Sequence, residues 1–88
     1  MPQFRKKPVV IEARQWTNTD ACREDFAQWF DDHDQMFSTR GSVVEVETSA
    51  GTMRAEVGDW ILCGVEVDEL YPCPASVFAA TYERIVAP

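Results

Sequence analysis

The sequence predicts a small α+β protein in which a twisted, mainly antiparallel sheet is covered by one amphipathic helix. Three observations lead to this fold class. A Gly-Asp turn precedes the densest aliphatic run of the chain, an apolar stripe recurs at helical spacing, and two alternating apolar and polar segments flank a short turn. The expected order is β-α-β-β-β followed by a short C-terminal helix, and such a sheet can roll toward a half barrel.

The first expected strand covers residues 9–16 and follows a basic lead-in over residues 1–7. One face of this strand is apolar, whereas the other carries Glu12 and Arg14 between apolar ends. Two interpretations stay open for this charged pair. It lies on a solvated face, or it supplies paired polar groups to a ligand cleft.

The amphipathic helix is expected over residues 19–33. The polar cluster 17–20 can cap its N-terminus, and acidic residues follow in the first turns, where the helix dipole favours them. One apolar stripe recurs at a period of 3.6 residues and consists of Cys22, Phe26, Trp29, Phe30 and His33. We interpret this stripe as a core-facing surface rather than a cofactor site. Residues 34–42 are expected to form a loop.

Residues 43–48 and 52–57 alternate between apolar and polar side chains, which predicts a β-hairpin. The inward positions of the second strand include Met53, Ala55 and Val57. Arg54 should face an outward glutamate of the first strand. Such an exposed pair contributes only about 0.2 to 1 kcal/mol, so it indicates register rather than function.

The segment 57–82 organises the rest of the chain. A turn is expected at Gly58 and Asp59, because glycine accepts positive φ and an aspartate side chain can accept hydrogen bonds from nearby amides. The apolar run 60–63 is too short for a helix and is unbroken, which predicts a central strand buried on both faces. Residues 65–69 form the return turn before the next strand.

The end of the chain is expected to continue the sheet and then become helical. Residues 70–74 are extended, because a residue that precedes proline is disfavoured in the helical region. A proline can open a short helix over residues 74–82, in which Phe78 and Tyr82 share one face. Residues 83–86 could add a last edge strand beside the first strand.

Length and composition indicate one small domain over residues 1–88. A chain of this size buries only about 60 to 65 per cent of its unfolded surface, so a homodimer would add useful burial. Fifteen acidic against eight basic residues give a net charge of −7, which works against binding to nucleic acid or to an anionic membrane.

The cysteines suggest a reducing cytoplasm as the compartment. The chain contains three cysteines, none is part of a CxxC pair, and nothing resembling a signal peptide precedes them. We therefore expect free thiols. No apolar window approaches the length of a membrane span.

The sequence shows no catalytic, metal or cofactor motif. The single histidine, His33, lies at the expected helix end without a serine or cysteine in local register, so we predict a protein that is not an enzyme. The spacing of His33 and the three cysteines matches no zinc finger, ribbon or knuckle. Gly58 and Gly64 lack the spacing and the Lys-Ser/Thr pair of a phosphate loop.

A softer signal comes from the aromatic residues. If several of them line one end of the sheet together with an arginine, they form a stacking pocket for a base or for a partner's side chain. The candidate binding residues are Arg14, Trp16, Arg54, Asp59, Trp60, Tyr71 and Tyr82. Core packing is the alternative for the aromatic members, and capping of the turn amides is the alternative for Asp59.

Three blocks of the sequence, FRKKPVVIEARQW (4–16), TMRAEVGDWILCG (52–64) and YPCPASVFAATYE (71–83), together resemble a widespread family of small orphan proteins of tailed bacteriophages and prophages. The chain departs from the family pattern at Val57, where a proline is usual, and at Cys63, where a basic residue is usual. Its turn at 65–69 is also longer. The resemblance implies a setting, a phage accessory protein in the bacterial cytoplasm, and no established activity.

Two functions follow from these observations as hypotheses. The first is a non-enzymatic binding module that recognises a host or phage protein, which suits the small size, the acidic surface and the missing nucleophile-base set. The alternative is a protein that sequesters a nucleotide-like small molecule in an aromatic pocket, with Arg14 and Arg54 as the cationic partners.

Overall fold

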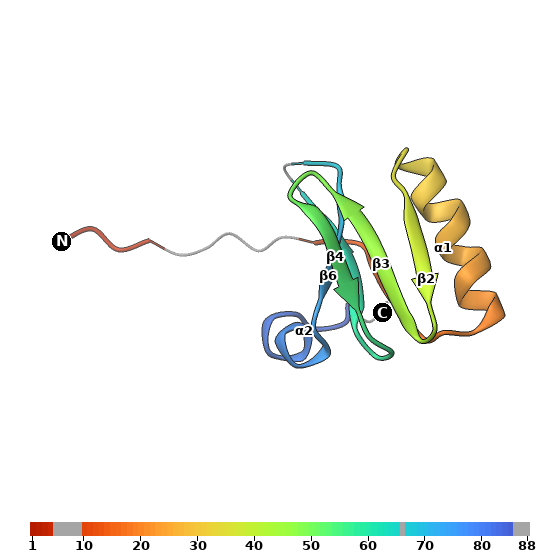
Figure 1. The fold of residues 1–88 in the computed structure, drawn as a ribbon. Coiled ribbons are helices and arrows are strands. Elements are labelled where there is room, and N and C mark those ends of the chain that lie inside the picture. The colour runs from red at the N-terminus through yellow and green to blue at the C-terminus, as the bar shows by residue number, and fades with distance from the viewer. Residues whose placement is uncertain (5–9, 66, 86–88) are drawn as a thin grey trace.

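The computed structural model describes residues 1–4, 10–65 and 67–85 (Figure 1). The elements, in chain order, are β1 Ala13–Gln15, α1 Asp20–Asp32, β2 Phe37–Arg40, β3 Val43–Thr48, β4 Gly51–Ala55, β5 Trp60–Cys63, β6 Leu70–Cys73 and α2 Ala75–Thr81. The strands form two three-stranded antiparallel sheets, β1-β5-β6 and β2-β3-β4. The predicted α+β class is confirmed, although the strands divide between two sheets, and those of the described part form no closed barrel.

Helix α1 begins and ends where the sequence pattern predicts. Thr19 is the N-cap, and its side-chain Oγ1 accepts a hydrogen bond of 3.1 Å from the backbone N–H of Cys22. His33 is the C-cap, and Asp34 follows with a φ of 52°, a left-handed conformation that stops the helix. Figure 1 shows α1 beside β2, with α2 on the opposite side of the molecule.

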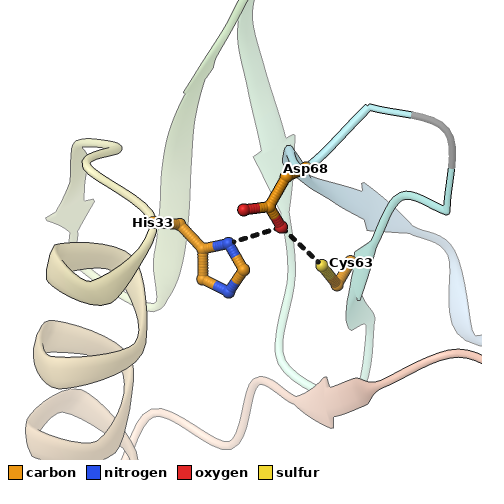
Figure 2. Close-up of side chains that lie close together, drawn as sticks. All are labelled: His33, Cys63 and Asp68. Atoms are coloured by element: carbon orange, nitrogen blue, oxygen red, sulfur yellow. Dashed lines mark hydrogen bonds and ion pairs between the residues drawn. The ribbon is translucent and has the colours of Figure 1, made fainter.

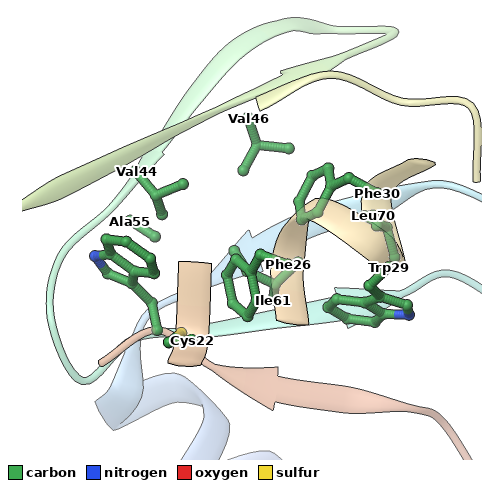
Figure 3. Packing of buried hydrophobic residues seen from close by; sticks show 10 residues of the cluster. Cys22, Phe26, Trp29, Phe30, Val44, Val46, Ala55, Ile61 and Leu70 are labelled. Atoms are coloured by element: carbon green, nitrogen blue, oxygen red, sulfur yellow. The ribbon is translucent and has the colours of Figure 1, made fainter. Parts of the chain in front are cut away.

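The core is formed by α1 together with strands of both sheets (Figure 3). Phe26 contacts Trp16 and Phe30 with ring centroids 5.6 and 5.8 Å apart. The strands contribute Val44, Val46, Ala55, Ile61 and Leu70, all buried. The apolar stripe predicted for the helix is therefore a core surface, because four of its members, Cys22, Phe26, Trp29 and Phe30, are buried.

Strand β5 is the central strand of its sheet, as predicted. It lies between β1 and β6. Ile61 and Leu62 point to opposite faces, yet both are buried, with 0% and 1% of their surface exposed. A strand with both faces covered explains why the run 60–63 shows no polar alternation.

The hairpin β3-β4 is also confirmed, and Arg54 lies opposite Glu45 with a nitrogen–oxygen distance of 3.7 Å. The second strand ends earlier than predicted. Ala55 is buried, and Met53 lies on the same inward face opposite the buried Val46, although 39% of it is exposed. Val57 lies beyond the strand and is 53% exposed, so its inward assignment is wrong. The alternating pattern predicts on which face of the sheet a side chain lies, but it does not predict how much of that face the opposing layer covers.

The prediction of a loop over residues 34–42 is wrong, because these residues include the strand β2. This strand pairs with β3, and Phe37 packs on Phe30 with ring centroids 4.7 Å apart. Gly41, with a φ of 62°, permits the tight turn between β2 and β3. One apolar residue followed by three exposed ones is too weak a pattern to predict an edge strand.

Two other strands also differ from the prediction. The first is confined to β1, although backbone bonds from Cys63 N–H to the Glu12 carbonyl and from Trp16 N–H to the Asp59 carbonyl extend its pairing. The position of Val9 lies outside the described residues. Residues 83–85 form no strand, and Val86 lies outside the described part.

Candidate functional site

The sheet β1-β5-β6 presents one face to α1 and the other to an open groove. Because side chains alternate along a strand, Ile61 faces the core whereas Trp60 and Leu62 face the other way. Leu62 lies opposite Tyr71 in the register of β5 and β6. It is buried outside the main core, so it belongs to a second apolar layer beneath the groove.

Three aromatic rings form a row along this layer. Trp60 and Phe78 stack with centroids 4.2 Å apart at an angle of 13°, and Phe78 and Tyr82 stack at 5.2 Å and 29°. Phe78 lies on α2 and Tyr82 is its C-cap, four residues later, and their rings lie on the same side of the molecule. Helix α2 has no fully buried residue, and we infer that this row of rings attaches it to the sheet.

The groove has a volume of about 1340 Å³ and is lined by the aromatic row, by Tyr71 and by segments on either side of it. Its exposed apolar residues come from three separate parts of the chain: Val10, with 76% exposure, Val65 and Val67, with 63% and 65%, and Ile85, with 68%. The charged lining residues of the described part are Glu69, Glu83 and Arg84. The groove is therefore mainly apolar, with a mixed, predominantly acidic margin.

Asp59 has a structural role at the end of this groove. Its Oδ2 accepts a hydrogen bond of 2.8 Å from the Glu56 N–H, and its Oδ1 accepts one of 3.0 Å from the Ala75 N–H. The first bond caps the turn at Gly58, and the second caps the start of α2, where Pro74 provides no side-chain cap. Asp59 therefore caps backbone amides, as the alternative interpretation of this residue predicted.

The other predicted binding residues lie elsewhere. Arg14 donates to Asp25 at 2.7 Å and lies 4.5 Å above the Trp29 ring, on the face that packs toward α1. Arg54 pairs with Glu45 on the other sheet, and Trp16 is a core residue. The structure therefore brings together Trp60, Tyr71 and Tyr82 but separates them from both predicted arginines.

Phe78 and the exposed valines are groove residues that the sequence did not predict. Phe78 lies one helical turn before Tyr82, and that spacing was a usable signal for a shared surface. Val65 and Val67 lie in a segment that was assigned only as a return turn. Two valines among acidic residues in a turn were the available sign of an exposed apolar surface.

A separate polar cluster lies on the other side of the same turn and joins His33, Cys63 and Asp68 (Figure 2). Asp68 Oδ1 lies 2.9 Å from His33 Nδ1 and accepts a hydrogen bond of 3.4 Å from Cys63 Sγ. Cys63 is a free thiol. Burial is the largest cause that raises the pKa of this thiol. The hydrogen bond to Asp68 and the negative charges of Asp68 and Glu12 raise it further.

Tyr71 is expected to ionise later than a free tyrosine. Burial, followed by the neighbouring Tyr82, raises the pKa of Tyr71 above its ordinary value of 10.0. A pKa that is higher in the folded chain contributes stability below the unfolded-state pKa, and this contribution is lost as the pH rises through the folded-state pKa. In Tyr82→Phe, Tyr71 is the one remaining tyrosine, so an ultraviolet absorbance titration should give a higher midpoint in the native protein than in urea. Equal midpoints would contradict the burial of this ring.

Neither a protein-family model, nor a curated protein, nor a solved structure matches this chain. Within residues 1–4, 10–65 and 67–85, no helix has the length and apolar character that a membrane span requires.

Proposed function

We propose that this chain is a non-enzymatic binding module, a phage accessory protein that acts in the bacterial cytoplasm and holds a segment of a host or phage protein in its groove. The observation that carries the proposal is the gathering of exposed apolar side chains from three separate parts of the sequence beside the aromatic row, along one open groove. Exposed apolar surface of this extent costs free energy in water, so it is typical of a surface that a partner covers.

The charge of the chain indicates the chemistry of the partner segment. The net charge is −7, and Glu69 and Glu83 lie among the lining residues. A segment with apolar or aromatic anchors and flanking basic residues would match both features, because charge complementarity speeds encounter and disfavours wrong partners. The aromatic row supplies the kind of ring-bearing side chains that dominate binding energy at protein interfaces.

A nucleotide-like small molecule has less support as the occupant. The faces of Trp60 and Phe78 already stack on each other, so a base would have to separate them. Arg14 and Arg54, the cations predicted for its phosphates, are paired with carboxylates outside the groove. A drug-sized ligand also fills a site of roughly 300 to 1,000 Å³, which is less than the volume of this groove.

The test uses groove variants that leave the core untouched. Val67→Ser and Ile85→Ser change exposed lining residues, and Val57→Ser changes an exposed valine that is not among the lining residues. The wild type and the variants are immobilised, incubated with lysate of phage-infected host cells, and compared by quantitative mass spectrometry. If a partner binds in the groove, the amount recovered with the double variant Val67→Ser/Ile85→Ser should fall at least about tenfold, which corresponds to a loss of about 1.4 kcal/mol in binding free energy. The amount recovered with Val57→Ser should equal that of the wild type.

Two results would count against the proposal. A partner retained equally by the groove variants and by Val57→Ser would place recognition on another surface. Native mass spectrometry that shows a small molecule carried by the wild type, and lost in the groove variants, would instead support the sequestering function.

A further inference from the structure

We propose that His33 Nδ1, Cys63 Sγ and Asp68 Oδ1 form a binding site for a divalent transition-metal ion of the zinc type. The three donor atoms lie within 4.8 Å of one another (Figure 2). Imidazole nitrogen, thiolate sulfur and carboxylate oxygen are the three ligand types that zinc uses in proteins. This site is independent of the proposed groove function, because none of its residues lines the groove.

The three donor atoms are arranged unlike a catalytic triad and lie near the spacing of a metal site. Zinc bond lengths of 2.0 to 2.3 Å in tetrahedral geometry imply donor separations of about 3.3 to 3.7 Å. The oxygen–sulfur distance of 3.4 Å lies in this range, and the oxygen–nitrogen distance of 2.9 Å is shorter, so the exposed Asp68 carboxylate would move slightly away from His33 to admit the ion. In a triad the imidazole contacts the nucleophile directly and the carboxylate stands behind it. Here the carboxylate lies between them.

The hydrogen bonding of His33 Nδ1 also supports a bound cation. Its Nδ1 is buried and makes no hydrogen bond within the described part of the chain, although the carboxylate oxygen is near. In the tautomer with the proton on Nε2, the Nδ1 lone pair faces that oxygen. A cation between the two would satisfy both lone pairs, whereas a buried unpaired nitrogen costs free energy.

Two of the ligands are held by regular structure. His33 is the C-cap of α1, and its ring meets Trp29 edge-on with centroids 6.1 Å apart. Cys63 is the last residue of β5, and its N–H bonds to the Glu12 carbonyl at 3.0 Å. Asp68 is on the turn, with 78% of its side chain exposed, so it can adjust to the ion. Binding would displace the Cys63 thiol proton to solvent, and three protein ligands leave the fourth position to water.

The full chain is tested for zinc by competition with a chromophoric chelator and for cobalt by absorption spectroscopy. The wild type should bind one ion and show a thiolate-to-cobalt charge-transfer band. Cys63→Ser and Asp68→Asn should each weaken zinc binding by more than about 100-fold, because even outer-shell changes cost 10- to 100-fold. Cys73→Ser and Asp34→Asn, which change a cysteine and an aspartate outside the cluster, should bind as the wild type does.

Three outcomes would overturn the metal site. These are no zinc binding by the folded wild type, equal binding by the wild type and Cys63→Ser, and a cobalt spectrum without a thiolate band. Any of them would leave His33, Cys63 and Asp68 as a polar cluster that binds no metal. Asp68→Asn keeps the test valid if Cys63→Ser misfolds, because Asp68 is an exposed turn residue whose replacement disturbs no core contact.

Discussion

Trp16→Ala is expected to lower the free energy of unfolding by about 3 to 5 kcal/mol, the range for removing a large buried aromatic side chain. Trp16 has no exposed surface and contacts Phe26 in the core. Its indole Nε1 also donates a hydrogen bond of 2.8 Å to the Ser42 carbonyl, which joins the end of β1 to the turn between β2 and β3. Urea denaturation followed by far-ultraviolet circular dichroism measures the loss.

Trp16→Phe separates the two contributions of the indole. This variant keeps much of the ring packing but removes the hydrogen bond to Ser42. Its free energy of unfolding should therefore fall less than that of Trp16→Ala. Trp60→Ala is the comparison variant: Trp60 is only partly buried on the groove face, so its replacement should lower the free energy of unfolding less than Trp16→Ala does. A loss below about 1 kcal/mol for Trp16→Ala would contradict the assignment of this residue to the core.

Gln35→Ala is expected to cost about 2 to 3 kcal/mol, because it removes three hydrogen bonds worth roughly 1 kcal/mol each. The Gln35 side-chain Nε2 donates to the carbonyls of Glu47 at 2.9 Å and of Leu70 at 2.7 Å. Its Oε1 accepts from the Leu70 N–H at 2.8 Å. Glu47 belongs to β3 and Leu70 to β6, so this one amide links the two sheets. Chemical denaturation gives the change in stability.

Gln28→Ala is the control for this linkage. Gln28 is an exposed glutamine of α1, and within the part of the chain that the structure describes its side chain bonds only to Asp32, one helical turn away. Its replacement should change stability by less than about 0.5 kcal/mol. Equal effects of the two substitutions would show that the bridge between the sheets adds nothing measurable.

The residues of the candidate groove could be predicted only in part. Trp60, Tyr71 and Tyr82 were identified as aromatic residues outside the helical stripe, and they do lie along one groove. The arginines assigned to the same site lie elsewhere. Whether an arginine reaches a pocket depends on which face of which sheet carries it, and the sequence showed neither that the strands divide between two sheets nor where they divide.

The cluster of His33, Cys63 and Asp68 could not be predicted from spacing. Local motifs reveal metal sites when the ligands lie close together in the sequence. Here one ligand ends a helix, one ends a strand and one lies on a turn. Only the packing of α1 against β5 brings the histidine to the thiol.

The sequence by itself determined the elements whose signals are local and repeated: α1 from its apolar period and its Thr19 cap, the β3-β4 hairpin from alternation, and β5 from an unbroken aliphatic run. The tertiary structure decided the division into two sheets, the edge strand β2 and the bridge at Gln35. Local patterns report which face of an element avoids water. Which elements meet depends on contacts between residues distant in the chain, and these leave no periodic trace in the sequence.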